Sequence, residues 1–381
     1  LSQIWSKLGR KSATLGTLGF ALNALNIHTP LTTPDPIFIH EKLAKLKKEK
    51  IDFLAIEASS HGIEQNRLDG LIINAAAFTN LSHDHLDYHG NIKKYFSAKK
   101  RLFEKVIGEG SNVTLNIDSQ AFDDLSKICK KRKHKVMTYG EKGGDLQLTN
   151  VLDYEKGQIF NFSAFGRKFE TSVPFSGKFQ IKNLLCAIGI AIAHGHNIEK
   201  IIEVIPKLES IKGRCQLIAR HPNGAKIYLD YAHTPEALKE VLSNLRSKIM
   251  GGKLYILFGC GGDRDKSKRI VMGRIAAKFS DGAFITDDNP RNENPKKIRK
   301  QILAGFLPQT GVMVKEIEKR QKAIKTAISK LKNNDSLIIA GKGHEDYQII
   351  GEEKQKFDDR KITKEEIKKI AKKYKIKKPL E

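Results

Sequence analysis

Short apolar segments that end in polar residues and glycines alternate along this chain with segments of helical periodicity. Four segments of the first half predict strands by their length and apolar content: 51–59, 71–81, 112–118 and 135–140. Residues 95–107 predict a helix, with an apolar face formed by Phe96, Leu102, Phe103 and Val106. Strands that alternate with helices favour a mostly parallel α/β sheet.

The pattern changes after residue 145. Residues 145–175 alternate between apolar and polar side chains with a period of two, which predicts antiparallel hairpins attached to the larger sheet. An apolar helix is predicted over 181–195, and a domain boundary near 207–213.

A second α/β unit is predicted beyond this boundary, with strands in 226–233, 253–263, 281–290 and 335–346. Thr234 and Pro235 suit the N-cap and first turn of a helix. Thr363 and Glu366 have the spacing of a capping box for the last helix.

The formal net charge of +25 comes from 68 basic and 43 acidic residues. Nucleic-acid binding is one interpretation of this excess, and a lysine-rich solvated surface that also suits anionic small molecules is the other. The lysines are spread over many segments without interleaved aromatic residues or a nucleic-acid-binding motif, which favours the second interpretation.

The four cysteines, Cys129, Cys186, Cys215 and Cys260, form no C-x-x-C pair, and we expect reduced thiols in a cytoplasmic protein. No apolar run is long enough for a membrane span, and no secretory leader opens the sequence.

Two polar clusters follow predicted strands of the first half. Residues 57–67 begin with Glu57, whose carboxylate suits Mg²⁺ at a sheet edge, although a solvated loop carboxylate is the simpler interpretation of this residue alone. Residues 79–90 carry His83, His85 and His89, whose spacing matches no standard zinc signature. Lys99 has by itself the pattern of a helical surface lysine.

Three glycine-rich or polar loops follow predicted strands of the second half, at 258–269, 286–295 and 340–346. Each loop by itself is only modest evidence for a binding site. In open α/β sheets the carboxyl ends of the strands form the ligand-binding edge, so three such loops predict one shared binding surface.

Taken together, seven strings of this chain resemble the Mur ligase family in order and spacing: EASSHGIEQNR, FTNLSHDHLDYHG, YFSAKKRLF, LDYAHTPEAL, FGCGGDRDKSKR, DNPRNENP and AGKGHEDYQ. The resemblance implies an α/β protein with two domains. Residues 1–210 would form a mostly parallel-sheet, ATPase-type central domain with a small antiparallel sheet, and 211–381 a Rossmann-like C-terminal domain that binds the incoming amino acid.

The activity implied is ATP-dependent amide-bond formation for peptidoglycan synthesis. ATP would convert the D-glutamate carboxylate of UDP-N-acetylmuramoyl-L-Ala-D-Glu into an acyl phosphate, which the amine of meso-diaminopimelate attacks. The implied cofactors are Mg²⁺ and a carbamylated Lys99. We expect a cytoplasmic monomer without membrane or nucleic-acid partners.

The resemblance also assigns residues to roles. Glu57, His85 and Lys99 match the catalytic and metal-binding positions, with Lys99 a ligand once it is carbamylated. Contacts to the UDP-muramyl dipeptide match Thr32, Thr33, Ser59, Gln65 and Arg67. Nucleotide contacts match Asn183, Arg214 and Asp230. The diaminopimelate site matches Arg264, Asp288, Asn289, Pro290, Arg291, Gly341 and Glu345.

Arg291 is the residue expected to select the amino acid. Diaminopimelate differs from lysine by a second carboxylate, which fits the two-pronged donor of a guanidinium. The DNPR string therefore argues for diaminopimelate.

The phosphate loop of the family, G-T-N-G-K-T/S, would be expected just before Leu1, and the N-terminal uridine-binding domain before that. We therefore expect residues 1–381 alone to bind ATP weakly and to turn it over slowly. A folylpolyglutamate-type ligase, an inactive fragment and a basic nucleic-acid-binding protein remain the alternatives.

Overall fold

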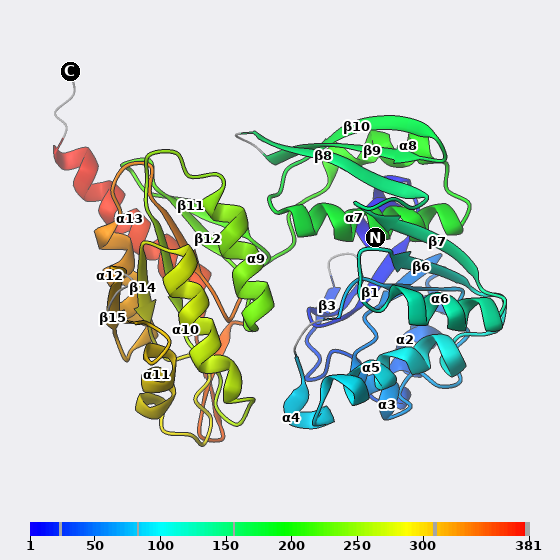
Figure 1. The fold of residues 1–381 in the computed structure, drawn as a ribbon, viewed down its shortest axis with the longest axis horizontal. Helices are drawn as coiled ribbons and strands as arrows, with labels where there is room; N and C mark the ends of the chain where they lie inside the picture. Colours follow the sequence, from blue (N-terminus) through cyan, green and yellow to red (C-terminus); the bar gives the residue numbers. More distant parts are fainter. Residues whose placement is uncertain (23–24, 82–83, 155–156, 308–310, 378–381) are drawn as a thin grey trace. The chain divides into compact units, whose positions relative to one another are not determined.

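The computed structural model describes residues 1–22, 25–81, 84–154, 157–307 and 311–377. The chain forms two compact units, Leu1–Glu209 and Ser210–Glu381, which are described separately below. Figure 1 shows each unit as sheets flanked by helices.

Unit 1 holds a four-stranded and a six-stranded sheet. The first has the order β3-β2-β1-β4, with β1 and β4 parallel. Its strands are β1 (Ser12–Gly16), β2 (Gly19–Leu22), β3 (Leu25–Ile27) and β4 (Phe53–Ile56). The second has the order β10-β9-β8-β7-β6-β5. Its strands are β5 (Ala75–Phe78), β6 (Asn112–Asn116), β7 (Lys135–Gly140), β8 (Leu146–Tyr154), β9 (Gly157–Ala164) and β10 (Arg167–Val173).

The antiparallel hairpin strands continue the parallel part of the second sheet. Strands β5, β6 and β7 are parallel, and β8 joins β7 through the pairs Tyr139–Leu146 and Gly140–Gln147. The predicted change of pattern after residue 145 is therefore confirmed, and the hairpins attach edge to edge.

The helices of unit 1 bury apolar faces against these sheets. They are α1 (Ser2–Lys7), α2 (Pro36–Lys48), α3 (Ser60–Glu64), α4 (Leu86–His89), α5 (Ile92–Arg101), α6 (Phe122–Lys131), α7 (Lys178–Ala193) and α8 (Ile198–Val204). Helix α7 is apolar around most of its circumference because it packs on β5 to β8 within one core cluster. The helix predicted over 95–107 begins earlier, at Ile92, and its last turn is π-helical, η1 (Leu102–Val106). A short 3₁₀ turn, η2 (Ile205–Lys207), follows α8.

Unit 2 contains a six-stranded sheet of order β11-β12-β16-β13-β14-β15, in which only the edge strand β11 is antiparallel. Its strands are β11 (Gln216–Arg220), β12 (Lys226–Leu229), β13 (Leu254–Phe258), β14 (Gly282–Ile285), β15 (Met313–Glu316) and β16 (Ser336–Ile339). Strands β13, β14 and β16 are buried throughout, as parallel strands covered on both faces must be. A separate hairpin pairs β17 (Tyr347–Ile350) with β18 (Glu353–Lys356).

Helices α9 and α10 cover one face of this sheet, and α12 and α13 lie on the other (Figure 1). The helices of unit 2 are α9 (Pro235–Arg246), α10 (Ser267–Phe279), α11 (Pro295–Leu303), α12 (Arg320–Lys330) and α13 (Asp359–Lys377). The N-cap predicted at Thr234 is confirmed, because its side chain accepts a hydrogen bond from the Ala237 amide.

The capping box predicted at Thr363 and Glu366 is wrong. Helix α13 begins one turn earlier, at Asp359, and the Thr363 hydroxyl donates inside the helix to the Asp359 carbonyl at 2.7 Å. The carboxylate of Asp358 instead accepts the amides of Arg360 and Lys361 at 2.8 and 3.1 Å. An acidic residue just before the first turn therefore supplies the cap.

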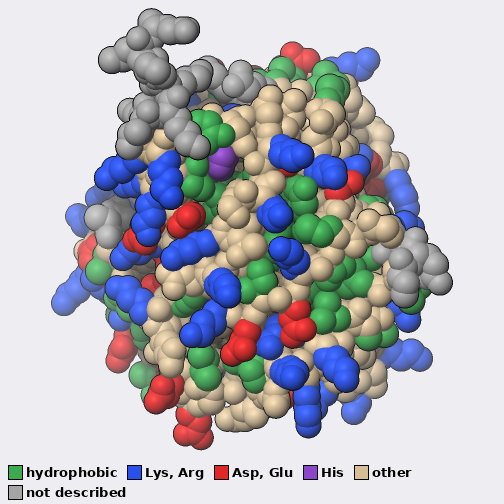
Figure 2. Space-filling model, turned by 90° about the vertical axis from the view of Figure 1, so that its left-hand side faces the viewer, with side chains coloured by type: hydrophobic (Ala, Val, Ile, Leu, Met, Phe, Trp, Pro, Cys, Tyr) green, Lys and Arg blue, Asp and Glu red, His purple; other side chains and the backbone are tan. Residues whose placement is uncertain are grey.

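Basic side chains are scattered over the surface. Figure 2 shows Lys and Arg separated by uncharged and hydrophobic side chains on one face, with acidic groups among them. Among the described residues, no helix is long and apolar enough to cross a membrane. The four cysteines all lie among the described residues, are buried and form no disulfide bond.

Candidate active site

Glu57 lies at the carboxyl edge of the four-stranded sheet, directly after β4, and its side chain is exposed. Its Oε2 accepts two hydrogen bonds from Thr17, one from the amide at 2.9 Å and one from the hydroxyl at 2.8 Å. Gly16 makes this approach possible, since a Cβ at that position would lie 2.7 Å from the same oxygen. No described residue hydrogen-bonds to Oε1, so half of the carboxylate is left for a cation.

The residues predicted to contact the UDP-muramyl dipeptide form one connected group beside Glu57. The Thr33 hydroxyl donates to the Glu57 carbonyl at 2.8 Å and accepts the Ser59 amide at 3.0 Å. The Arg67 guanidinium donates to the Thr33 carbonyl at 2.7 Å and to the Gln65 side chain. Thr32 joins through its hydroxyl, 3.3 Å from that of Thr17. The structure thus brings together all five predicted residues.

Aromatic rings of the histidine segment gather near His85. The His61 ring lies 5.0 Å from the ring of His85 and 4.0 Å from that of Tyr88, measured between centroids. His89 is buried, and its Nε2 lies 2.9 Å from the Ser60 hydroxyl. His85 has a left-handed backbone (φ 55°), a strained conformation that is concentrated at functional sites. His83 lies outside the described residues.

Lys99 points into the same region. Its ammonium lies 5.0 Å from the centroid of the Tyr95 ring, which His85 also approaches, at 5.9 Å. Burial lowers the pKa of Lys99, and the negative charges of Asp84 and Glu57 offset part of this effect by raising it. The sequence pattern alone, which indicated a surface lysine, therefore missed the partial burial of this residue.

The three predicted metal-binding residues are suitable for Mg²⁺ only as a mixed set. No cluster of three or more His, Cys, Asp or Glu side chains arranged to hold a metal occurs among the described residues. By the family resemblance Glu57 and His85 would supply two ligands, and Lys99 lies close enough to Glu57 for their charges to interact. A carbamate on Lys99 would supply the third, anionic ligand.

The residues predicted to contact the nucleotide belong to both units. Asn183 is exposed on α7 of unit 1. In unit 2, Asp230 follows β12 and accepts the amides of Cys215 and Ala232, both at 2.6 Å. Burial raises the pKa of Asp230 despite these hydrogen bonds. The Arg214 guanidinium lies over the Tyr231 ring, 4.8 Å from its centroid.

The three polar loops of unit 2 follow the adjacent parallel strands β16, β13 and β14, at one edge of the sheet. The backbones of two of them touch. A Cβ at Gly262 would lie 1.8 Å from the Pro290 carbonyl, and one at Gly259 would lie 2.2 Å from the Thr286 carbonyl. The third loop joins them at Gly341, where a Cβ would lie 2.5 Å from Asp288 Oδ2. The three loops that were predicted to share one surface therefore lie in contact, and the binding role of this surface stays a prediction.

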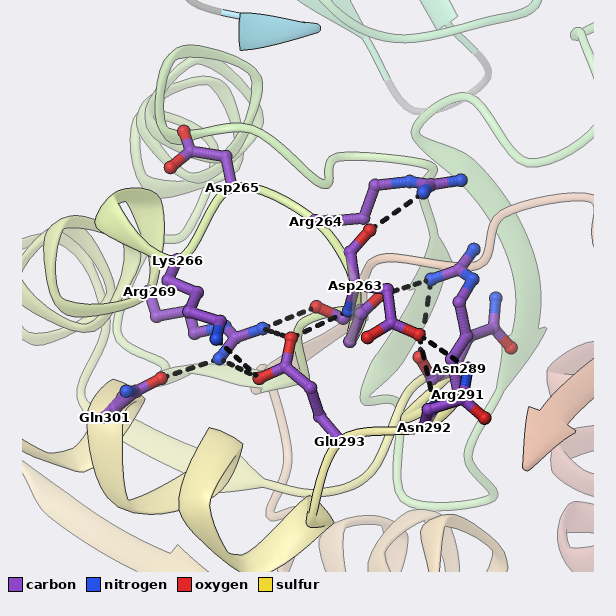
Figure 3. Close-up of polar contacts among 12 residues, drawn as sticks. Asp263, Arg264, Asp265, Lys266, Arg269, Asn289, Arg291, Asn292, Glu293 and Gln301 are labelled. Carbon is purple, nitrogen blue, oxygen red and sulfur yellow. Dashed lines mark hydrogen bonds and ion pairs between the residues drawn. The ribbon is translucent and has the colours of Figure 1, made fainter. Parts of the chain in front are cut away.

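Arg291 and Arg264 present their guanidinium groups on the same side of Asp263 (Figure 3). Arg291 donates to the Gly262 carbonyl at 2.9 Å, and Arg264 to the Asp263 carbonyl at 2.9 Å. Burial lowers the pKa of Arg291, and the positive charge of Arg264 lowers it further. Two guanidinium groups that repel each other form an attractive site for a carboxylate.

A buried ion pair holds these two loops together (Figure 3). Arg269 of α10 has no exposed side-chain surface and donates to both oxygens of Glu293, at 2.9 and 2.8 Å. It also donates to the Gly261 carbonyl at 3.0 Å and to Gln301 at 2.7 Å. Glu293 in turn accepts the Asp263 amide at 2.7 Å. The Arg269 hydrogen bond lowers the pKa of Glu293 to about 2.

Asn289 and Glu345 are linked directly, with the Asn289 amide donating to Glu345 Oε2 at 3.1 Å. Asp288, Asn289 and Pro290 are buried, and Glu345 is half-buried. The seven residues predicted for diaminopimelate thus belong to three loops in mutual contact. Sequence reasoning missed the buried Arg269 and Lys342 and the half-buried Glu293, since the local sequence around a charged residue beside a glycine-rich loop does not show whether it is buried.

Two family models match most of the chain. Residues 1–191 match the Mur ligase middle domain, and residues 213–343 match the Mur ligase, glutamate ligase domain. The chain belongs to the Mur ligase family. Two of its most similar relatives are named UDP-N-acetylmuramoyl-L-alanyl-D-glutamate–2,6-diaminopimelate ligase. The protein of Rickettsia bellii (strain RML369-C) is 41% identical over 368 residues, which cover 95% of this chain and 76% of the relative. That of Caulobacter vibrioides is 41% identical over 363 residues, covering 94% and 74%.

Solved structures agree with this membership. A structure titled with the same diaminopimelate ligase name matches 97% of this chain and 75% of its own, with a TM-score of 0.67 and 33% identity. A folylpolyglutamate synthase of Mycobacterium tuberculosis matches 89% of this chain and 83% of its own, with a TM-score of 0.72. Its identity of 15% shows a shared fold alone.

Proposed function

We propose that this member of the Mur ligase family joins meso-diaminopimelate to UDP-N-acetylmuramoyl-L-Ala-D-Glu in peptidoglycan synthesis, using ATP. The observation that carries the proposal is the surface in unit 2 where the Arg291 guanidinium lies within electrostatic reach of Arg264 and of two carboxylates, Asp288 and Glu345. A substrate with two ammonium and two carboxylate groups complements such a mixture of charges. The two ligases of the same name, at 41% identity, support the assignment.

The chemistry follows from the acid that has to react. A carboxylate is a poor electrophile, so transfer of the ATP γ-phosphoryl group to one of its oxygens makes an acyl phosphate and releases ADP. The unprotonated amine of diaminopimelate then attacks the carbonyl carbon. Phosphate leaves with the electrons of the C–O bond, and the amine loses a proton. Mg²⁺, when bound, supplies charge neutralisation for the phosphates.

Residues of this chain have defined parts in this proposal. Glu57 and His85 would hold the metal ion at the sheet edge, and the group of Thr33, Ser59 and Arg67 orients the muramyl dipeptide. Arg291 receives the second carboxylate of diaminopimelate, and Asp288 and Glu345 attract an ammonium group. Lysine offers no carboxylate at that position and would leave the Arg291 guanidinium without its partner.

Lys99 becomes a metal ligand in this proposal by reacting with CO₂. Its neutral amine forms an N–C bond to the carbon of CO₂ and releases one proton, which leaves an anionic carbamate. The lowered pKa of Lys99 supports the proposal, because it increases the fraction of neutral amine at a given pH. A ¹³C-carbamate resonance in ¹³C-bicarbonate, present in the wild type and absent from Lys99→Ala but retained in Lys100→Ala, tests the modification.

The function is tested with the purified chain, ATP, Mg²⁺ and the UDP-muramyl dipeptide, by measuring ADP release and product mass. Addition of meso-diaminopimelate should yield one UDP-muramyl tripeptide per ADP, and lysine should yield little. The reaction is followed to its end point at high protein concentration.

The alternative functions predict different results for the same purified chain. Glutamate addition to a reduced folate, without reaction of the muramyl dipeptide, would replace this proposal by a folylpolyglutamate-type activity. Binding of random duplex DNA with steep salt dependence, unaffected by the muramyl dipeptide, would favour a nucleic-acid-binding protein. Absence of ADP release with every acceptor would indicate an inactive chain.

A further inference from the structure

Lys342 is a buried cation within the loop that follows β16. Its side chain has no exposed surface, whereas a lysine in a glycine-rich loop would ordinarily extend into water. A buried ammonium is strongly unfavourable unless charged or polar partners surround it. The position of this side chain therefore depends on what it binds.

The partners of Lys342 are two residues of the proposed diaminopimelate site. Its Nζ donates to Asn289 Oδ1 at 3.0 Å and to Glu345 Oε2 at 3.0 Å. Because Asn289 also donates to Glu345 Oε2 at 3.1 Å, the three side chains form a closed ring of hydrogen bonds. The ring joins the loop after β14 to the loop after β16.

The ring fixes which way the Asn289 amide faces. Asn289 Oδ1 accepts two hydrogen bonds, from Lys342 Nζ and from the Ile349 amide at 3.0 Å. An amide turned by 180° would place its NH₂ group against both donors, so only one orientation is compatible. The Nδ2 atom must then face Glu345, and its second hydrogen stays available for a ligand.

Glu345 is held in a similar way. Its Oε2 receives both Lys342 and Asn289, while no described residue hydrogen-bonds to Oε1. The ring therefore leaves one amide donor and one carboxylate acceptor close together. An amino-acid centre, which carries an accepting carboxylate and a donating ammonium, matches this pair.

We propose that Lys342 is a positioning residue whose buried ammonium locks Asn289 and Glu345 into one donor–acceptor unit for an amino-acid centre of the substrate. The inference rests on the proposed function and extends it to a residue that touches no substrate. Lys342 sets the affinity of this unit, whereas Arg291 reads the carboxylate that distinguishes diaminopimelate from lysine.

The test compares two neutral substitutions of Lys342. Lys342→Met removes the charge and all three donors, and Lys342→Gln removes the charge but keeps two amide hydrogens. Calorimetric titration with meso-diaminopimelate should show the dissociation constant rising about 10- to 100-fold for Lys342→Met, as expected for lost hydrogen bonds to a charged group. Lys342→Gln should recover part of that loss.

Lys354→Met provides the matched control. Its ammonium lies over the same Tyr347 ring, 3.7 Å from the centroid, as Lys342 does at 5.5 Å. Lys354 is exposed on β18, so its replacement should leave the affinity unchanged. Thermal unfolding of each variant separates lost stability from lost affinity. Wild-type affinity in a destabilised Lys342→Met variant would overturn the proposal and make Lys342 a core residue only.

A crystal structure of Lys342→Met separates this inference from the proposed function. We expect Asn289 and Glu345 to adopt new rotamers, and unchanged rotamers would overturn the inference whatever the ligand. Failure of the wild type to bind meso-diaminopimelate would instead contradict the proposed function. Displaced rotamers in the variant would even then support the conclusion that the ring orients both side chains.

Discussion

The two sheet edges that carry the candidate site residues are built differently. At the edge in unit 1, Glu57 is exposed and bonded to a threonine, and His85 lies among aromatic rings. At the edge in unit 2, the loops are tied by ion pairs of buried cations: Arg269 with Glu293, Arg320 with Asp359 and Lys342 with Glu345. Arg320 also donates to the Ala340 carbonyl at 2.9 Å, just before Gly341.

The difference follows from what each edge is proposed to bind. A metal ion and phosphates bring their own charge, so flexible and partly hydrated ligands are sufficient in unit 1. An amino acid must be distinguished from close relatives, which requires groups that hold their positions before the substrate arrives. The loops of unit 2 are therefore more strongly prearranged than the edge of unit 1.

Replacement of Arg269 should cause the largest loss of stability. Arg269→Met leaves Glu293 without its buried partner, and breaking such a pair lowers the free energy of unfolding by about 3–5 kcal/mol. The single tryptophan, Trp5, lies in unit 1, so its fluorescence should keep the wild-type transition while the circular dichroism transition of unit 2 shifts. Lys266→Met is the control, since Lys266 is exposed and 3.8 Å from Glu293. Equal shifts of the circular dichroism transition in Arg269→Met and Lys266→Met would show that the buried cation adds no special stability to the edge in unit 2.

Replacement of Arg291 should act on selectivity with little loss of stability. Arg291→Ala should lower the preference for meso-diaminopimelate over lysine by about 10²–10³-fold, because wild-type Arg291 is left unpaired when lysine is bound. The ratio of the two dissociation constants measures this directly. A variant that rejects lysine as strongly as the wild type would show that other residues read the second carboxylate.

Acid should weaken unit 2 through Glu293. The pKa of Glu293 is lowered from 4.5 to about 2 in the folded chain, so the unfolded state takes up the proton first as the pH falls. The contribution, about 3 kcal/mol by linkage, is complete above about pH 4.5 and disappears as the pH falls towards 2. Urea unfolding followed by circular dichroism between pH 5 and 2.5 measures it. Glu293→Gln should flatten this dependence, and an unchanged slope would contradict the assignment.

The corresponding change in unit 1 should have the smallest effect. Glu57→Gln alters an exposed carboxylate whose hydrogen-bond donors, among the described residues, all belong to Thr17, so the free energy of unfolding should fall by about 1 kcal/mol or less. Trp5 fluorescence during urea unfolding reports this unit. A loss as large as that of Arg269→Met would mean that Glu57 is a structural residue.

Much of the architecture could be predicted from local pattern. The strands, the hairpins after residue 145 and the convergence of three loops follow from periodicity and from the edge rule for parallel sheets. The UDP-muramyl and diaminopimelate residues came from the family resemblance, and each of these two groups lies together. Their roles stay predictions.

The supports of the site could not be predicted in the same way. The burial of Arg269 and Lys342 and the partial burial of Lys99 depend on side chains that the fold brings together, and a cation has the same local pattern whether exposed or buried. The Thr363 capping box failed because Asp358, five residues earlier, competes successfully for the helix start. A left-handed backbone at His85 is likewise set by its surroundings, since no local glycine signals it.

The backbone of Arg291 limits how this enzyme family member can be redesigned for other amino acids. Its φ of 50° is held from both sides, by its amide to the Ile349 carbonyl and by its carbonyl to the Gly351 amide. Valine, isoleucine and threonine tolerate that conformation poorly, whereas glycine and asparagine adopt it readily. In a saturation library at this codon, the main-chain conformation therefore excludes most residue types whatever the substrate. Variants with a new selectivity should be sought among the few residues that adopt a positive φ readily.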